Sequence, residues 1–424
     1  MPVPTSRAAS ALSADRIVRT TVVLLFSAWL VDYVDRFVIS LALPAIGVEF
    51  DLSRGQQGLV VSAFFLAYAL CQIPGGMIAD RFGGARVMLW ALLAWSLFTA
   101  LTGFAWSFAA LLALRFAFGL AEGAFPAASI KVLVERTTLR QRMSANGIIM
   151  SSNSIAAVLT PVLAPILIVA FGWRSIFWSA AAVGLLVSLA VRRWLPEPSH
   201  SERISESRVP VRAVLRSGVL WRFAAIMFGY NVIGWGLSTW APTYLSEERG
   251  LPLTTVGPLM AIPALGAALA TIVGGRLSDR LAGNHRLMIV PAMAVAAIAL
   301  LVLSQTTSFV GFAVCSTIAV FSASLAYMPI YAVPMRSLPP AYVGVGSSII
   351  GFGGQLAGIV SPAAMGVLAD LLSFQAAFGF LVVGAVIAAV MAVFTPQDTE
   401  AFLAATAFPD DRHIDTDRSL EEHS

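Results

Sequence analysis

Long apolar stretches separated by short polar segments run through almost the whole chain. A membrane-spanning helix needs about 20 mainly apolar residues, and twelve stretches are long enough, with centres near residues 31, 68, 96, 119, 157, 183, 234, 268, 296, 321, 355 and 384. The pattern predicts an all-α membrane protein with twelve transmembrane helices in two six-helix halves. We expect a cytoplasmic N-terminus (1–19), an N-terminal six-helix bundle (20–194), a cytoplasmic central loop (195–220), a C-terminal six-helix bundle (221–395) and a cytoplasmic tail (396–424).

The composition excludes an ordinary soluble protein. Hydrophobic residues make up 58% of the chain and charged residues only 12%, whereas roughly 25% of the residues in soluble domains are charged. The net charge of +4 does not indicate nucleic-acid binding, because 22 of the 27 Lys and Arg residues lie in one set of alternating polar segments and only 3 in the other set. This asymmetry follows the positive-inside rule and predicts a multi-pass protein with both termini in the cytoplasm.

A repeated motif links the two halves. The segment after the second span reads GGMIADRFGGAR (75–86), and the segment after the eighth reads GGRLSDRLAGNHR (274–286), so that Gly75 pairs with Gly274 and Asp80 with Asp279 at an offset of 199. Repeats of six spans are typical of secondary transporters whose substrate site lies between the halves. Small residues let two helices approach, and we expect the aspartate to accept hydrogen bonds from a neighbouring helix N-terminus. A gating role is therefore predicted for Gly75, Asp80, Arg81, Gly275, Asp279 and Arg280; an ordinary tight turn is the alternative.

Two predicted spans contain ionisable side chains, which are costly inside a bilayer and mark ion or substrate paths. The first span holds Asp32, Asp35 and Arg36, and the fourth holds Arg115 and Glu122. With all five ionised the set has a net charge of −1, so that protonation of one carboxylate would favour entry of an anion. A structural ion-pair network that only braces the two helices is the alternative. Since no histidine falls in a predicted span, we expect protons carried by these carboxylates as the coupling ion, and no cofactor.

The second half offers amide and aromatic side chains in place of charges. Asn231 and Trp240 lie in the seventh span, Tyr327 in the tenth and Gln355 in the eleventh. Such groups suit hydrogen bonding and stacking against a small polar solute. Tryptophan and tyrosine near helix ends also serve as interfacial belts or in packing, which is the alternative for Trp240 and Tyr327.

The repeated loop, the twelve spans and the central division resemble the major facilitator superfamily over nearly the whole chain. The resemblance implies a central cavity lined by spans one, four, seven and ten. The sequence DYVDR in the first span, Tyr68 in the second and RFAFGLAE in the fourth resemble the anion:cation symporter family, particularly its bacterial sugar-acid and organic-anion carriers. This likeness implies that Asp35 and Glu122 carry protons and that Arg36 and Arg115 shape the anion site.

The same resemblance implies substrate contacts from further residues, and the chain departs from the family at some of them. Tyr33 and Tyr68 match the family pattern. Asn153 stands where the family has a glutamine, and Gln355 where it usually has an asparagine, which suggests a substrate other than galactonate. Asp32 replaces a common asparagine, so it could share or take over the proton role of Asp35.

The sequence therefore predicts a secondary active transporter that takes up a small organic anion, such as a sugar acid or other carboxylate, by proton symport and alternating access. We expect it to act as a monomer in the bacterial inner membrane, with the lipid bilayer as its other partner. A drug or metabolite antiporter of the same fold is less favoured, because the fifth span has no glycine between Gly147 and Gly172. An enzyme is not indicated, because the spans offer no nucleophile with a base and Cys71 and Cys315 suggest neither a disulfide nor a metal site.

Overall fold

The computed structural model describes residues 6–198, 214–281, 284–338, 340–397 and 399–406. Most of the predicted central loop (195–220) and tail (396–424) lies outside these residues. All regular structure among the described residues is helical, as predicted. By contact, the described residues divide into two compact units: unit 1 holds residues 6–198, 236–265 and 358–377, and unit 2 holds 214–235, 266–357 and 378–406.

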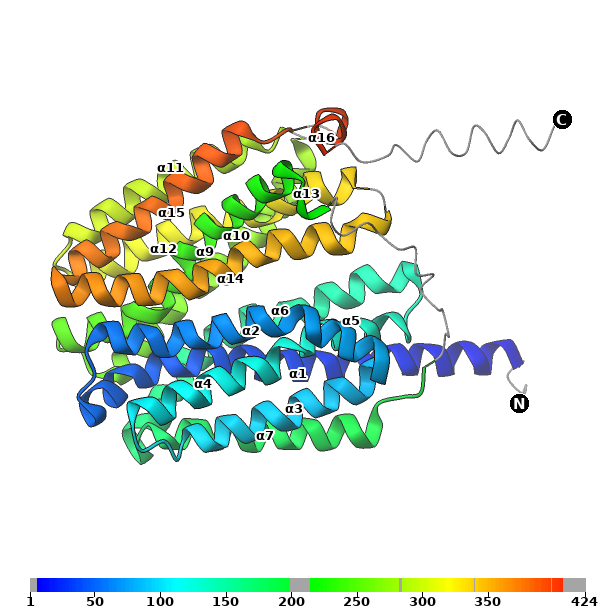
Figure 1. Ribbon diagram of the computed structural model, residues 1–424, viewed down its shortest axis with the longest axis horizontal. Helices are drawn as coiled ribbons and strands as arrows, with labels where there is room; N and C mark the ends of the chain where they lie inside the picture. The colour runs from blue at the N-terminus through cyan, green and yellow to red at the C-terminus, as the bar shows by residue number, and fades with distance from the viewer. Residues whose placement is uncertain (1–5, 199–213, 282–283, 339, 398, 407–424) are drawn as a thin grey trace. The chain divides into compact units, whose positions relative to one another are not determined.

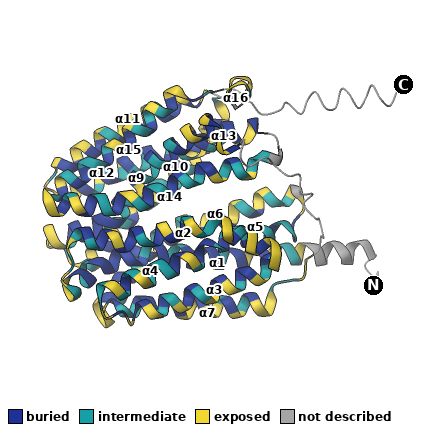
Figure 2. Ribbon diagram, viewed as in Figure 1, coloured by how far each residue is buried: buried dark blue, intermediate teal, exposed yellow. Residues whose placement is uncertain are grey.

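The first half of the sequence forms helices that all belong to unit 1 (Figure 1). They are α1 (Ser6–Phe50), α2 (Arg54–Phe82), α3 (Gly84–Thr102), α4 (Phe108–Gly123), α5 (Phe125–Val134), α6 (Leu139–Phe171) and α7 (Arg174–Trp194). Helix α2 packs against α4, α1 packs against α6 and α7, and α3 packs against α4 and α7. Buried residues run along these packed helices (Figure 2).

The second half of the sequence supplies the remaining helices. They are α9 (Gly218–Thr243), η1 (Tyr244–Glu248), α10 (Leu253–Arg280), α11 (Arg286–Gln305), α12 (Phe309–Leu325), α13 (Tyr327–Ser337), α14 (Pro340–Leu371), α15 (Phe374–Phe394) and α16 (Thr399–Thr406). Helices α9, α10, α14 and α15 contribute one part to each unit. Unit 1 thus contains, besides the first seven helices, several helix ends from the second half.

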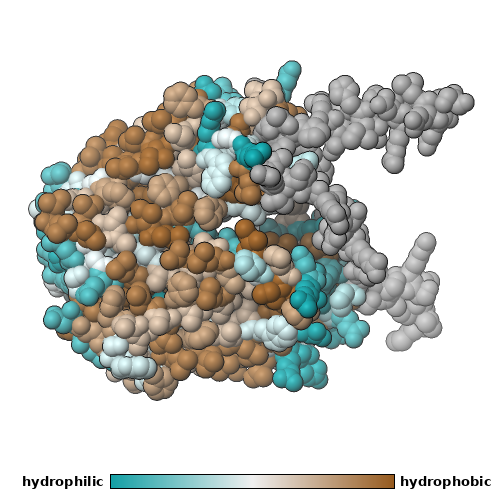
Figure 3. All heavy atoms as spheres, in the orientation of Figure 1, coloured by the Kyte–Doolittle hydropathy of each residue, from teal (hydrophilic) through white to brown (hydrophobic). Residues whose placement is uncertain are grey.

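The helices agree with the predicted spans. Among the described residues, 10 segments are long and apolar enough to cross a membrane, and α1 and α9, with 45 and 26 residues, fill the two remaining places. Large apolar side chains such as Leu97, Leu186 and Leu189 are exposed at positions where a lipid environment would cover them. Apolar residues dominate the face drawn in Figure 3, and hydrophilic residues gather toward the helix ends.

The fourth and tenth spans are each broken at an equivalent place in the repeat. Helix α4 ends before Ala124 and α5 follows; α12 ends before Ala326 and α13 follows. A glycine of the repeated motif packs against each break. A Cβ on Gly75 would lie 2.5 Å from the Cα of Ala124, and a Cβ on Gly274 would lie 2.7 Å from the carbonyl oxygen of Leu325. Each glycine is therefore required by a close helix approach.

Candidate functional site

Two glycines of α4 bring the charged helices together. A Cβ on Gly119 would collide with the carbonyl oxygen of Phe64 in α2, and a Cβ on Gly123 would lie 2.7 Å from that of Tyr68. Because α4 lies this close to α2, the side chain of Glu122 is enclosed and is fully buried. The charged residues of α1 meet it there.

The first charged cluster consists of Asp32, Arg36 and Glu122. Arg36 Nε donates to Glu122 Oε1 at 2.5 Å, and its Nη2 pairs with the same carboxylate and, at 3.1 Å, with Asp32 Oδ2. Tyr68 flanks the guanidinium, whose carbon lies 4.6 Å from the ring centroid, and Tyr33 is 5.5 Å away. We call Asp32, Arg36 and Glu122 the ion triad. Its guanidinium pairs with both carboxylates at once.

The second cluster consists of Asp35 and Arg115, on a different side of α1. Arg115 is buried, its Nη2 donates to Thr102 Oγ1 at 3.4 Å, and its guanidinium lies over the rings of Phe118 and Phe177 at 4.8 and 5.2 Å. Asp35 lies in the field of Arg115, yet within the described part of the chain neither of its oxygens accepts a hydrogen bond. The five charged residues that were predicted to act together therefore form two neighbouring clusters, both within unit 1.

The other predicted substrate residues lie in both units. Asn153 lies half-buried on α6 in unit 1. In unit 2, Asn231 donates to the Met227 carbonyl oxygen at 3.0 Å. The Tyr327 ring packs in a tilted arrangement on that of Tyr230, with centroids 5.6 Å apart, and Gln355 Oε1 is buried without a hydrogen-bond partner among the described residues.

Trp240 has a structural contact that accounts for its position. It is fully buried in unit 1, its indole N–H donates to the carbonyl oxygen of Pro362 at 2.9 Å, and its ring packs on Phe374. In this structure Trp240 therefore makes the packing contacts that were the alternative to substrate binding, and its indole N–H is already hydrogen-bonded.

The predicted gating loops differ from each other in detail. Asp80 pairs with Lys131 Nζ of α5 at 3.0 Å, so its described partner is a lysine rather than the expected helix N-terminus. Arg81 lies over the neighbouring ring of Phe82 at 5.3 Å. In the second loop Gly274 makes the close approach, whereas a Cβ on Gly275 would meet its nearest neighbour at 3.8 Å.

His285, the second-last residue of the second copy of the motif, is buried. Arg336 Nη2 lies 3.0 Å from its Nε2, and since an arginine can only donate, Nδ1 carries the proton toward Ser278 Oγ at 3.3 Å. Burial, reinforced by the charge of Arg336 and opposed by Asp279, lowers the pKa of His285. The imidazole is therefore neutral, and its two nitrogens hydrogen-bond Ser278 and Arg336. The gating role of Asp279 and Arg280, which precede His285 in the same loop, stays a prediction.

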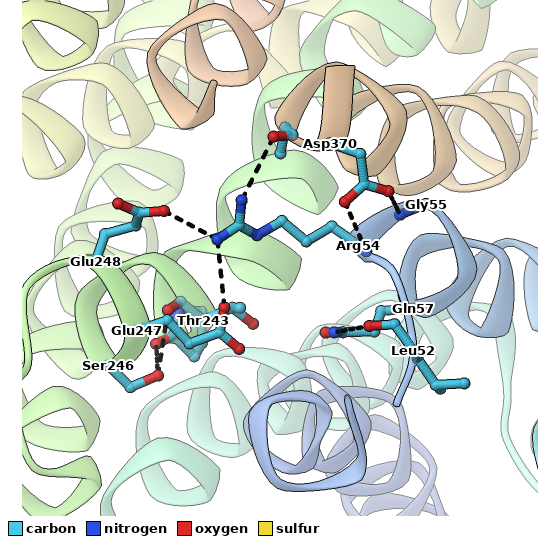
Figure 4. Close-up of polar contacts among 11 residues, drawn as sticks. Leu52, Arg54, Gly55, Gln57, Thr243, Ser246, Glu247, Glu248 and Asp370 are labelled. Atoms are coloured by element: carbon cyan, nitrogen blue, oxygen red, sulfur yellow. Dashed lines mark hydrogen bonds and ion pairs between the residues drawn. The ribbon is translucent and has the colours of Figure 1, made fainter. Parts of the chain in front are cut away.

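One cluster escaped the sequence analysis. Arg54, in the first turn of α2, pairs with Glu248 at 2.9 Å and with Glu247 at 3.6 Å, and it lies over the ring of Phe374 at 4.4 Å. The carboxylate of Asp370, at the end of α14, accepts the backbone N–H of Arg54 at 3.0 Å. Figure 4 shows these contacts converging from α2, η1 and α14, all within unit 1.

Small residues allow this convergence. A Cβ on Gly58 would collide with the carbonyl oxygen of Pro362, and a Cβ on Gly366 would collide with that of Arg54. The signal in the sequence was weak: Arg54 is one of the few basic residues on the predicted extracytoplasmic side. We call Arg54, Glu247, Glu248, Asp370 and Phe374 the Arg54 cluster.

The fold, the membrane spans and the buried charges together define a transmembrane transporter. Residues 25–362 match the family model of the Major Facilitator Superfamily, and the chain belongs to that family. It is 31% identical over 369 residues to the probable sulfoacetate transporter SauU of Cupriavidus necator, with 81% of this chain and 85% of the relative covered. It is 26% identical to the probable galactarate/D-glucarate transporter GarP of Escherichia coli K12, with 88% and 94% covered.

Solved structures support the same fold. A D-xylose–proton symporter matches with a TM-score of 0.76 at 15% identity, covering 91% of this chain and 99% of that one. A bacterial homologue of the human lysosomal transporter Spinster matches with a TM-score of 0.74 at 19% identity, covering 92% and 97%. The predicted fold and the likeness to sugar-acid and anion transporters are confirmed, and the family is one of transporters rather than enzymes.

Proposed function

We propose that this protein is a secondary active transporter of the bacterial cytoplasmic membrane that takes up a small organic anion together with protons. The substrate class is a sugar acid or another compact carboxylate, and the relatives named for sulfoacetate and for galactarate or glucarate support an anionic substrate. The observation that carries the proposal is the ion triad, in which one buried guanidinium is shared by two carboxylates.

The triad links anion binding to proton binding by charge balance. With Asp32, Arg36 and Glu122 all ionised, the triad has a net charge of −1. An entering carboxylate that pairs with Arg36 must displace Glu122 or Asp32, which would leave an unpaired buried charge. Such a charge costs several kcal/mol, and a proton on the displaced carboxyl removes that cost. Anion and proton binding therefore favour each other.

Asp35 supplies a second proton site beside the triad. Its buried oxygens accept no hydrogen bond within the described residues, whereas Asp32 is paired with Arg36 at 3.1 Å. This difference favours Asp35 as the proton carrier of α1 and Asp32 as part of the anion receptor. Arg115, which lies near Asp35, then couples to the proton site rather than to the substrate directly.

The second half of the sequence provides the groups suited to substrate hydroxyls. Asn231, Tyr327 and Gln355 present amide and phenol groups, and the unpaired oxygen of Gln355 is available to accept a hydroxyl hydrogen. A site that hydrogen-bonds such hydroxyls discriminates strongly against analogues that lack them. We therefore propose these three side chains as contacts for a polyhydroxylated anion.

Proteoliposomes that contain an internal pH dye test the proposal. Sugar acids, sulfoacetate and aromatic carboxylates are added outside in turn, beside a set of cationic amphiphiles. We expect internal acidification with one class of organic anion. In Glu122→Gln, exchange of labelled anion should continue while accumulation against a gradient is lost. Arg36→Ala should weaken anion binding by about 10- to 100-fold, because charge-assisted hydrogen bonds are lost.

Two outcomes would overturn the proposal. Accumulation that persists in Glu122→Gln would remove the triad from coupling. Proton movement only with the amphiphiles, and in the opposite sense across a preset gradient, would instead indicate an exporter of the same fold.

A further inference from the structure

Helix α3 carries a row of buried hydroxyl groups that the ion triad does not use. Ser96, Thr99 and Thr102 are each at most 1% exposed, and their spacing of three residues places them on one helix face. Burying a hydroxyl without a partner is unfavourable. Within the described residues Thr102 reaches Arg115, but the hydroxyls of Ser96 and Thr99 have no hydrogen-bond partner.

The register of the helices places Thr99 opposite Asp35. At Gly184 of α7, an added Cβ would collide with the hydroxyl of Ser96 and lie 3.6 Å from a methyl of Val31 in α1. In the chain, α2 connects α1 to α3 and runs antiparallel to both, so α1 and α3 run in the same direction. One turn further along each helix, Val31 is followed by Asp35 and Ser96 by Thr99. The hydroxyl of Thr99 therefore faces the Asp35 carboxylate, although the two groups are not in hydrogen-bonding geometry in this structure.

The polar atoms at this place form a group without mutual hydrogen bonds. Both oxygens of Asp35, the hydroxyl of Thr99 and Nε of Arg115 are buried and have no partner among the described residues. More than about nine in ten buried polar groups in native proteins are paired, and an exception calls for an explanation such as a role in function. A carboxyl that exchanges a proton has such a role.

We propose that Thr99 is a positioning residue for the proton on Asp35. A hydroxyl can donate to the ionised carboxylate and accept from the protonated acid, so Thr99 serves both states by rotating. Its hydrogen bond is stronger to the charged form, and it therefore eases release of the proton. This inference rests on the proposed proton coupling, and it gives α3 a part in transport although α3 contributes no charge to either cluster.

The charges that face Asp35 come from α1 and α4 alone in the described structure. They are Asp32, Arg115 and Glu122. Helices α3 and α7 present hydroxyl and aromatic groups there. A variant of Thr99 therefore changes the surroundings of Asp35 without altering any charge.

Infrared titration of the purified protein tests the inference independently of transport. The C=O stretch of the protonated carboxyl is assigned by its loss in Asp35→Asn and then followed against pH. Thr99→Val keeps the shape and removes the hydroxyl, and we expect it to raise the titration midpoint by about one pH unit, the size of one charge-assisted hydrogen bond. Thr99→Ser should restore the midpoint to within about 0.3 of a unit.

Thr21→Val is the matched control. Thr21 is buried on α1 with an unpartnered hydroxyl in the described structure, but it lies fourteen residues, or about 21 Å, along the helix from Asp35. The control should leave the midpoint unchanged. An equal midpoint in Thr99→Val and the parent protein would overturn the inference, as would an equal shift in Thr21→Val or a carboxyl band that does not titrate.

Transport separates this inference from the proposed function. In Thr99→Val the pH profile of proton-coupled uptake should move to higher pH by the same amount, while the KM for anion exchange stays within twofold. If the parent protein moved no protons with any anion, the proposed function would fail. If it did move them and only the Thr99→Val profile were unchanged, the role of Thr99 alone would be wrong.

Discussion

Removal of the Arg54 guanidinium should loosen the contacts among α2, η1 and the end of α14 within unit 1. Within unit 1, the Arg54 side chain links α2 to η1 and to the end of α14. Transport by alternating access, as proposed above, requires such contacts to separate in each cycle. The partly exposed 2.9 Å ion pair with Glu248 contributes about 0.2–1 kcal/mol, the longer contact with Glu247 is neglected, and an exposed cation–π contact contributes about 0.5–1 kcal/mol. The loss in Arg54→Ala is therefore about 1–2 kcal/mol, which shifts the closed-to-open ratio by about 5- to 30-fold.

Cysteine labelling measures this shift. Thr243 is fully buried beside the cluster, and a Thr243→Cys variant, with Cys71 and Cys315 replaced by alanine, should react slowly with a membrane-impermeant maleimide. Arg54→Ala in that background should react about 5- to 30-fold faster. Arg249→Ala is the control, since its guanidinium hydrogen-bonds Tyr244 in its own segment.

A companion variant tests the other half of the same contact. The Asp370 carboxylate accepts the backbone N–H groups of Arg54 and Gly55 at 3.0 and 2.7 Å, where the dipole of α2 favours a negative charge. Asp370→Asn should raise the labelling rate in the same direction as Arg54→Ala. Unchanged rates in both variants would refute the reasoning that these contacts hold α2, η1 and the end of α14 together.

Further predictions concern the ion pair between Glu49 and Arg174 and the close contact between Gly75 and Ala124. Glu49 accepts from both Nη atoms of Arg174 at 2.6 and 2.7 Å, and this hydrogen bonding lowers its pKa below the ordinary 4.5. The ion pair therefore contributes its full stabilisation well above the ordinary pKa of 4.5, and this stabilisation is lost as the pH falls through the lowered pKa. Glu49→Gln should cost about 1 kcal/mol at pH 7 in thermal unfolding in detergent, and the difference from the parent should vanish in acid. Gly75→Ala should reduce uptake more than tenfold at equal expression, because the added Cβ would lie 2.5 Å from Ala124. Gly76→Ala, whose nearest contact is 3.7 Å away, should be tolerated.

The sequence predicted the spans well because each is long and mainly apolar, and it placed the five buried charges of α1 and α4 in the correct helices. It did not predict that adjacent residues Asp35 and Arg36 would join different clusters. Successive residues on an α-helix are turned by about 100°, so the neighbours in sequence face different helices. The charges of Arg115 and Glu122 lie on one face but about 10 Å apart along it, and each therefore meets a different partner.

The sequence did not predict the Arg54 cluster or the proximity of Thr99 to Asp35, and the reason is different. Arg54 meets Asp370 across 316 positions of the sequence, and no local pattern marks such a pair. Thr99 reads as one more small polar residue in an apolar helix. Its significance depends on the packing of Gly184 of α7, which lies close to both Ser96 of α3 and Val31 of α1.

On the proposed mechanism, selectivity for anions and coupling to protons have one cause. The guanidinium of Arg36 already has Glu122 and Asp32 as partners, so a neutral sugar could only add hydroxyl contacts and would not displace either carboxylate. An anion can displace one of them, and that displacement creates the unpaired carboxyl that a proton then neutralises. Competition for one buried guanidinium therefore excludes neutral sugars and calls for a proton in the same step.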